Sequence, residues 1–392
     1  MQKASWVPGA DGGPFPVEHL PYGVVDTGLG PPRCVAAIGD HAVDLALVAG
    51  RGLLGVDASV FEEATLNRFL AEGPDVWAEV RTRLSDVLTG VGYREEIQDC
   101  FLERSRVSNR LPVAVADYVD FYSSLEHATN LGRLFRPDAD PLLPNWRHLP
   151  VGYHGRAGTV VVSGTEIRRP LGQRRHADGG VVFGPSERLD IELEVGFVVG
   201  VGSSLGAPVR ADDARRHVFG VVLVNDWSAR DIQAWEYQPL GPFLGKSFAT
   251  SISAWITPLA ALEHCWVEGP VQEPAPLPHL QVTEPAALAI DLSVELNGSI
   301  VGRTGFAGLY WRMGQQLAHL TSNGASLRTG DLFASGTVSG STPGSEGSLI
   351  ELTNNTEFLA DGDEVVLRGR VVAGGVTFDL GECRGRVLPA LH

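Results

Sequence analysis

The sequence predicts a protein of two domains, the larger of which is built mainly of β-strands. The chain has 392 residues, which exceeds the usual size of a single core. The first ~110 residues carry helical patterns beside one hairpin, as a small domain would. After residue 112 the chain changes to short apolar runs separated by Gly and Pro, a texture typical of strands and loops.

The N-terminal part contains one predicted hairpin and two predicted helices. Short apolar runs at residues 35–38 and 42–45, the second containing Asp44, flank Gly39-Asp40, which indicates a hairpin. Apolar positions from Trp77 to Leu88 recur at helical spacing, and Gly90 suits the end of that helix. Gly73-Pro74 separates it from a shorter helix around residues 66–70.

The remainder of the chain reads as strands. Residues 160–162, 189–199 and 218–224 are strand-like, and residues 288–296 alternate strictly. Asn297-Gly298 after the alternating run is a strong hairpin signal, and Asp361-Gly362 leads into further strands at 365–367, 371–372 and 376–380. The proline-rich stretch 270–285 is expected to be a surface loop.

Composition excludes several classes of function. The net charge of −16 leaves no basic footprint for phosphates, which argues against nucleic-acid binding. Residues 1–14 contain no apolar run, so no signal peptide is expected, and no stretch approaches the ~20 apolar residues of a membrane span. The four cysteines are widely spaced, which fits neither a zinc site nor a disulfide framework. We therefore expect a cytoplasmic protein with free thiols.

A pair of glutamates is the clearest sign of chemistry. Glu192 and Glu194 alternate with Leu189, Ile191, Leu193, Val195 and Phe197, so strand geometry puts both carboxylates on one face. Like charges so close repel, and a hard divalent ion such as Ca²⁺, Mg²⁺ or Mn²⁺ would relieve that repulsion. The alternative is an ordinary solvated face, which the local pattern by itself favours.

Asp226 ends a buried-looking run and could belong to a site or cap a helix beginning at Trp227. In such a helix Arg230 and Gln233 would share a face with Asp226 and could donate to an anionic substrate, although a surface ion pair is the commoner fate of an arginine. Residues 241–247 resemble a phosphate loop but have three residues between the glycines instead of four, so we reject a nucleotide site.

Three more residues are open to two interpretations. A lone lysine such as Lys246 is usually solvated. His127 is one of eleven histidines, and Glu351 follows Leu349-Ile350 in an expected strand. By local pattern each is more often structural than catalytic.

Longer motifs resemble the fumarylacetoacetase family over residues 14–391. They are residues 19–23, 120–130 (Asp-Phe-Tyr-Ser-Ser-Leu-Glu-His-Ala-Thr-Asn), 143–146, 149–156, 225–233 (Asn-Asp-Trp-Ser-Ala-Arg-Asp-Ile-Gln) and 241–247 (Gly-Pro-Phe-Leu-Gly-Lys-Ser). The resemblance implies a mainly β fold with a small N-terminal SH3-like barrel at residues 1–112. A larger C-terminal mixed β-sandwich roll at residues 113–392 would follow, in a homodimer. Residues 172–188 match no motif of the family.

The resemblance also implies roles for residues. Asp120, Glu192, Glu194 and Asp226 would bind a metal, with Lys246 and Thr250 also beside the cations and Thr250 near a second one; Ca²⁺ and Mg²⁺ are expected, with Mn²⁺ as a substitute. His127 would activate water and Glu351 would orient it, while Arg230, Gln233 and Lys246 would stabilise oxyanion charge. The implied substrate contacts are Tyr122, Arg136, Tyr153, Tyr237 and Thr337.

The implied reaction is hydrolysis of the C–C bond of 4-fumarylacetoacetate to fumarate and acetoacetate, the last step of tyrosine and phenylalanine breakdown. A related acylpyruvate hydrolase or decarboxylase acting on another small diketo acid is the main alternative. A non-catalytic β-rich binding protein with a structural metal is a second, and it predicts loss of His127, Glu351 or Lys246, all of which are present.

Overall fold

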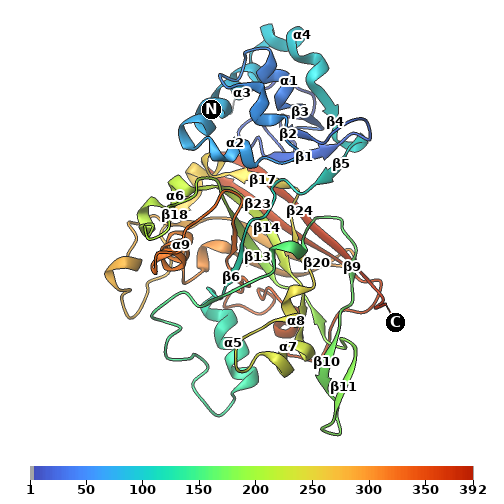
Figure 1. The fold of residues 1–392 in the computed structure, drawn as a ribbon, viewed down its shortest axis with the longest axis vertical. Helices are drawn as coiled ribbons and strands as arrows, with labels where there is room; N and C mark the ends of the chain where they lie inside the picture. The colour runs from blue at the N-terminus through green and yellow to red at the C-terminus, as the bar shows by residue number, and fades with distance from the viewer. Residues whose placement is uncertain (1–3, 392) are drawn as a thin grey trace.

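The computed structural model describes residues 4–391 and is mainly β (Figure 1). A small N-terminal unit lies at one end of the longest axis, and the larger C-terminal unit fills the rest. Helices α5, α7 and α8 lie at the end of the larger unit farthest from the N-terminal unit. No helix within residues 4–391 is long and apolar enough to cross a membrane.

The N-terminal unit contains the predicted hairpin and both predicted helices. The longer helix buries its apolar positions Trp77, Val80, Leu84, Val87 and Leu88, and Gly90 caps its end. The elements of the unit are β1 (Tyr22–Asp26), β2 (Arg33–Ile38), β3 (His41–Asp44), α1 (Leu45–Gly50), α2 (Asn67–Ala71), α3 (Pro74–Thr89), α4 (Arg94–Ile97), β4 (Phe101–Glu103) and β5 (Ser108–Arg110).

The N-terminal strands continue into the main sheet of the C-terminal unit. Tyr22 of β1 pairs with Ile256 of β17, so one hydrogen-bonded sheet runs in the order β4-β3-β2-β1-β17-β14-β13-β22-β6-β7. The C-terminal strands of this sheet are β6 (Tyr118–Phe121), β7 (Gly152–His154), β8 (Val160–Val162), β13 (Leu193–Val199), β14 (Val218–Asp226), β16 (Thr250–Ile252), β17 (Trp255–Pro258) and β22 (Leu332–Ala334).

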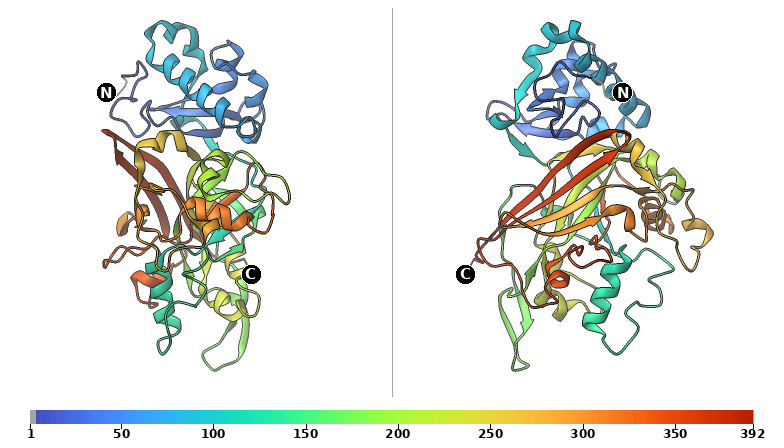
Figure 2. Two further views of the ribbon diagram at one scale, coloured as in Figure 1. Left: turned by 90° about the vertical axis from the view of Figure 1, so that its left-hand side faces the viewer. Right: turned by 180° about the vertical axis from the view of Figure 1, so that it is seen from behind.

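A second, five-stranded sheet has the order β21-β20-β23-β24-β9. The predicted hairpin at Asn297-Gly298 joins two of its strands, and both residues have positive φ (51° and 81°), which Asn and Gly tolerate best. The strands are β9 (Ile167–Arg168), β20 (Asp291–Leu296), β21 (Ser299–Gly305), β23 (Glu364–Ala373) and β24 (Val376–Leu388). Figure 2 shows the long strands β23 and β24, in red, crossing beside the main sheet. Inward residues such as Leu223, Leu292 and Leu367 form a shared core between the sheets.

Short elements complete the larger unit. They are α5 (Leu125–Phe135), β10 (Leu171–Arg175), β11 (Val181–Pro185), β12 (Leu189–Asp190), α6 (Ala214–His217), β15 (Ser228–Ala229), α7 (Arg230–Glu236), α8 (Leu244–Ser247), β18 (Trp266–Val267), β19 (Ala287–Leu288), α9 (Met313–Thr321) and α10 (Leu349–Leu352). The segment without a recognised motif, residues 172–188, contains the β10–β11 hairpin. A methyl group on Gly172 of that hairpin would lie 2.5 Å from Ile232, so the hairpin packs tightly against α7.

Three local expectations were wrong. The helix predicted from Trp227 begins only at Arg230, because Ser228 and Ala229 pair with Asp190 and Leu189 as β15. Glu351 lies in the short helix α10 and not in a strand. The alternating run at 288–296 is broken between β19 and β20, although its apolar members are buried up to Val294.

Candidate active site

Sheet register brings four carboxylates to one face of the main sheet. Glu194 of β13 lies opposite Val224 of β14, and Asp226 is two residues further along β14 on the same face. Ala334 of β22 pairs both with Gly196 of β13 and with Asp120 of β6, which carries Asp120 to that face as well. Four residues from three separate parts of the chain therefore converge.

The four carboxylates of Asp120, Glu192, Glu194 and Asp226 form one compact cluster. They offer oxygen atoms that all lie within 4.8 Å of one another, and all four residues are buried. The solvated-face interpretation of the Glu pair was therefore wrong: Glu192 is 4% exposed and Glu194 is 0% exposed. Asp226 is not a helix cap either, since it ends β14 and its side chain enters the cluster.

Two buried cations border the cluster. The Lys246 Nζ atom lies 2.5 Å from Glu192 and 2.6 Å from Asp226, and Arg230 Nη1 lies 2.8 Å from Glu192. The solvated lysine and the surface ion pair are thus both excluded, because Lys246 and Arg230 are 4% and 7% exposed. Four carboxylates against two cations leave the cluster short of at least two positive charges.

This imbalance perturbs the acids. Burial raises the pKa of Asp120 and of Glu194 well above the ordinary range, and the charges of neighbouring carboxylates raise both further. Burial also raises the pKa of Asp226, against the opposing effect of Lys246. Glu192 is the exception: burial raises its pKa, but Lys246 and Arg230 outweigh burial and lower the pKa overall. Asp120 and Glu194, which have no cationic partner among the described residues, are therefore the acids whose charged forms a bound cation would stabilise most.

The unpartnered oxygens of the cluster indicate what kind of ligand it would bind. Both carboxylate oxygens of Glu194 and Oδ1 of Asp120 are buried without a hydrogen-bond partner among the described residues. Buried charged oxygens are costly unless they are paired or coordinate a metal. An all-oxygen, multiply negative donor set suits a hard divalent cation. The cluster therefore fits a divalent metal ion, which is what the family resemblance implied and not what the local pattern of the Glu pair favoured.

A histidine–glutamate pair lies beside the cluster. Ser124 caps α5 by accepting from the backbone N–H of His127, which fixes the first turn of this helix. His127 Nδ1 lies 2.6 Å from Oε2 of Glu351, and both side chains are buried. Burial raises the pKa of Glu351, but the His127 ring and hydrogen bonds from His127, Ser348 and Asn130 lower it to about 2. An ionised Glu351 can only accept, so Nδ1 carries the proton and Nε2 is left as the basic nitrogen.

The expected substrate-contacting residues differ in their surroundings. The Tyr122 ring contacts His127 edge-on at 5.2 Å, and the Tyr153 hydroxyl donates to Asp226 at 2.8 Å. Arg136 donates to the carbonyl of Pro141, and within residues 4–391 neither its Nε nor Oγ1 of the buried Thr337 has a hydrogen-bond partner.

The last two expected residues lie in different surroundings, Tyr237 at the surface and Thr250 buried beside the carboxylate cluster. Tyr237, after α7, is 49% exposed, so it lies at the rim. Thr250 donates to Asp226 at 3.3 Å.

Sequence reasoning missed several supporting residues. Asn130 donates to Oε1 of Glu351 at 3.0 Å, and Ser348 and Ser339 donate to Oε2 at 2.7 and 2.9 Å. Asn130 could have been found, because it lies three residues after His127 on the same helical face. Tyr118 is also buried, and its pKa is raised by burial and then by Asp226, Asp120 and Glu194. Ser348 could also have been found, because it lies three residues before Glu351 in the same segment, whereas no local signal marks Ser339.

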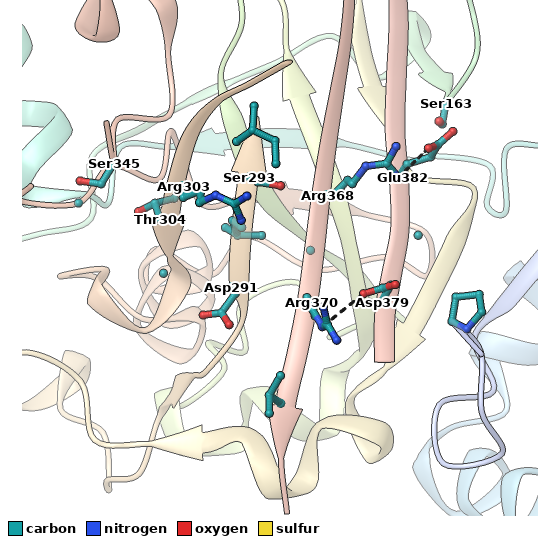
Figure 3. Close-up of a pocket in the computed structure, with 18 of the residues that line it drawn as sticks. Ser163, Asp291, Ser293, Arg303, Thr304, Ser345, Arg368, Arg370, Asp379 and Glu382 are labelled. Carbon is teal, nitrogen blue, oxygen red and sulfur yellow. Dashed lines mark hydrogen bonds and ion pairs between the residues drawn. The ribbon is translucent and has the colours of Figure 1, made fainter. Parts of the chain in front are cut away.

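A large hollow of the described chain lies elsewhere. It has a volume of about 1390 Å³ and lies over the outer face of the five-stranded sheet, where Arg370 pairs with Asp379 and Arg368 pairs with Glu382 (Figure 3). None of the expected site residues lines it. Its paired charges and open shape indicate a surface rather than a reaction site.

Comparison with known proteins is consistent along the whole chain. The family profile described as "Fumarylacetoacetase N-terminal" matches residues 18–112, and "Fumarylacetoacetate (FAA) hydrolase C-terminal" matches residues 117–388. The fumarylacetoacetase of Rattus norvegicus is 46% identical over 415 residues, covering 99% of both chains. The fumarylacetoacetase of Homo sapiens is 45% identical over the same length and coverage. That of Oryza sativa subsp. japonica is 45% identical over 418 residues, covering 99% of this chain and 97% of its own.

Solved structures share the fold. A fumarylacetoacetate hydrolase from Exiguobacterium antarcticum superposes with a TM-score of 0.57 at 16% identity, covering 94% of this chain and 99% of its own. A maleylpyruvate hydrolase from Sphingobium sp. SYK-6 gives a TM-score of 0.56 at 16% identity, covering 95% and 100%. At such identities the similarity concerns the fold alone.

Proposed function

The chain belongs to the fumarylacetoacetase family, and from this premise we propose how its buried site cleaves a carbon–carbon bond. The chain is a hydrolase, and its substrate is 4-fumarylacetoacetate, which yields fumarate and acetoacetate. The observation that carries the mechanism is a buried cluster of four carboxylates with unpartnered oxygens, next to a histidine–glutamate pair. The reaction would complete tyrosine and phenylalanine breakdown.

Asp120, Glu192, Glu194 and Asp226 would hold the metal ion. We propose Ca²⁺ at this site and Mg²⁺ at a second position near Thr250, with Mn²⁺ as a possible substitute, because all the donors are oxygens. When bound, a divalent cation polarises the keto oxygens and offsets enolate charge. Lys246 lies beside the ligands: burial lowers its pKa, but Asp226 and Glu192 raise it overall, so it stays protonated. It therefore acts as a counter-charge and not as a coordinating atom.

His127 would act as the general base. Its Nε2 takes a proton from water while the water oxygen bonds to the carbonyl carbon next to the scissile bond. Glu351 accepts from Nδ1 at 2.6 Å and stabilises the imidazolium that forms. Collapse of the tetrahedral carbon then breaks the C–C bond and releases fumarate, and the departing enolate carbon takes the proton back from the His127 imidazolium to become acetoacetate, which regenerates the base.

Three side chains would stabilise the oxyanion. Arg230 uses Nε and Nη1 for Asp190, Glu192 and Gln233, which leaves its buried Nη2 without a partner in the described chain. Gln233 accepts from Arg230 through Oε1, so its amide N–H groups remain available. Together with Lys246, these donors are fixed before the charge develops, which is the arrangement that lowers a barrier most.

The remaining contacts would bind the substrate. Burial raises the pKa of Tyr122, and the charges of Glu192 and Glu351 raise it further, so its hydroxyl stays protonated as a donor. Arg136, Tyr153, Thr337 and the rim residue Tyr237 supply further polar groups. We propose that Arg136 pairs with a substrate carboxylate, because its buried Nε has no hydrogen-bond partner among the residues that the structure describes.

A direct assay tests the proposal. Purified protein is supplied with Ca²⁺ or Mg²⁺ and with fumarylacetoacetate, and release of fumarate is followed with acetylpyruvate as a competing substrate. Turnover of fumarylacetoacetate in preference to acetylpyruvate is the expected result. Absence of turnover with either metal would overturn the assignment, and preference for acetylpyruvate would favour the related acylpyruvate hydrolase.

We also propose the chain's organisation and setting. Residues 1–112 and 113–392 would be its two domains, and its four cysteines, each buried and unpaired, suit a reducing cytoplasm.

The hollow of Figure 3 supports a homodimer. Four arginines and four acidic residues line it, so its charges balance although the whole chain has a net charge of −16, and two copies can meet there without repulsion. Light scattering should give twice the monomer mass, and Arg370→Glu should lower it; a monomeric parent protein would contradict this arrangement.

A further inference from the structure

Asp190 is a buried carboxylate for which the proposed reaction has no role. It ends β12 and is 0% exposed. Its Oδ1 accepts from the backbone N–H groups of Ile191 (2.7 Å) and Leu349 (2.8 Å). Its Oδ2 accepts from the guanidinium Nε of Arg230 (2.8 Å) and from the backbone N–H of Ile350 (3.2 Å). Each carboxylate oxygen thus accepts two hydrogen bonds.

These contacts join two elements that carry the chemistry. Arg230 is the first residue of α7, which also carries Gln233. Leu349 and Ile350 begin α10, which carries Glu351. The preceding Ser348 does not cap α10, because its hydroxyl donates to Glu351 instead, so Asp190 supplies the acceptor for the first N–H groups from a distant strand.

The contact also sets the direction of the guanidinium. A guanidinium is planar, so fixing Nε on Asp190 and Nη1 on Glu192 leaves little freedom for the third nitrogen. That third nitrogen, Nη2, is the buried donor without a partner. Without Asp190 the head group of Arg230 could turn about its stem, and the start of α10 would lose two acceptors.

We infer that Asp190 is a positioning residue that holds Arg230 and Glu351 in register with each other. It touches neither the carboxylate cluster's unpartnered oxygens nor His127. It acts instead through Arg230 and Glu351. The inference rests on the proposed roles of Arg230 and Glu351. It gives this carboxylate a reason to be buried at the point where β12, α7 and α10 meet.

The variant Asp190→Asn tests the inference. The amide keeps the size of the side chain but places an N–H against either Arg230 or the start of α10. Both kcat and kcat/KM for fumarylacetoacetate should fall together by about 100-fold, because misplaced groups act in the transition state more than in substrate binding. Parent-like kcat in folded Asp190→Asn protein would overturn the inference.

Asp331→Asn is the matched control. Asp331 is also a buried carboxylate that accepts from two backbone N–H groups, those of Asp117 (3.0 Å) and Arg328 (2.8 Å), but it contacts no proposed site residue. This variant should lower the melting temperature while kcat stays at the parent value. An equal loss of kcat in both variants would mean that Asp190 has only a general structural role.

A kinetic double-mutant cycle tests the route of action. If Asp190 acts through Arg230, Asp190→Asn should lower kcat far less in an Arg230→Gln background than in the parent. Independent, multiplicative losses would contradict the inference. If Asp190→Asn does not fold, Asp190→Glu keeps the charge but displaces both partners by one methylene, and parent-like kcat in that variant would overturn the inference equally. Failure of the parent chain to turn over fumarylacetoacetate is a separate outcome that refutes the proposed function.

Discussion

Replacement of Glu351 by glutamine probes the histidine–glutamate pair most directly. The carboxylate accepts from His127 at 2.6 Å, Ser348 at 2.7 Å, Ser339 at 2.9 Å and Asn130 at 3.0 Å. Glutamine has the same shape but only one acceptor oxygen. It can still occupy the site if Asn130 turns its amide, so Glu351→Gln should fold.

The loss of stability follows from the pKa of Glu351. Burial raises this pKa, but the partners of the carboxylate lower it from the ordinary 4.5 to about 2. At about 1.4 kcal/mol per pH unit, the net interaction amounts to about 3 kcal/mol in favour of the charged form. Because the folded-state pKa is depressed, this stabilisation is present above about pH 4.5 and is lost as the pH falls towards about 2.

Urea unfolding and steady-state kinetics measure the two consequences. Glu351→Gln should be less stable than the parent by about 2–3 kcal/mol near pH 7, and the difference should shrink as the pH approaches about 3. Its kcat should fall by about 10⁴-fold, because the neutral amide no longer stabilises the imidazolium that forms at His127. Glu357→Gln, an exposed glutamate on the segment after α10, is the matched control and should change neither quantity. An unchanged kcat, or a stability difference that persists undiminished in acid, would refute this account of Glu351.

Three further predictions concern the base and the metal cluster. His127→Ala should abolish turnover but leave metal binding, measured by calorimetry, intact; an active variant would remove His127 from the mechanism. Glu192→Ala should lower both metal affinity and melting temperature, since it removes one proposed ligand and the buried carboxylate that both Lys246 and Arg230 contact, leaving Lys246 with Asp226 and Arg230 with Asp190. A melting temperature that is unchanged with and without metal would count against this ligand set. Burial and mutual repulsion raise the pKa values of Asp120, Glu194 and Asp226, so protein stripped of metal by a chelator should lose stability as the pH rises above about 4. Added Ca²⁺ should reverse that loss. Stability that depends on neither pH nor Ca²⁺ would show that the cluster binds no metal.

Several local features of the fold could be predicted from the sequence because interactions between near neighbours in the chain determine them. The α3 helix follows from apolar spacing ended by Gly90, and the β20–β21 hairpin follows from Asn297-Gly298, whose residues both adopt positive φ. The helix expected from Trp227 failed because a long-range pairing with β12 overrides local propensity at Ser228 and Ala229. Glu351 was assigned to a strand for the related reason that a short apolar run does not distinguish a strand from a buried turn of helix.

The sequence by itself determined the kinds of groups available for chemistry. Alternation placed Glu192 and Glu194 on one face, and the longer motifs related the whole chain to a family with a metal and a general base. It could not decide whether that face was solvent-exposed or buried, because burial depends on distant segments, here those that place Tyr153, Arg230 and Lys246 against the carboxylates. Tertiary structure alone decided this, by placing Asp120 beside Glu194 through strand β22 and Lys246 between Glu192 and Asp226.

The same holds for the pairing of His127 with Glu351, which lie 224 residues apart in the chain. Their 2.6 Å contact arises from the packing of α10 against α5, and Asp190 anchors α10 from a third segment. Periodicity and spacing report on neighbours within a turn or a strand. Contacts between such distant segments form only when the chain packs its core. The sequence therefore shows which polar side chains are available, whereas the fold decides which of them lie together.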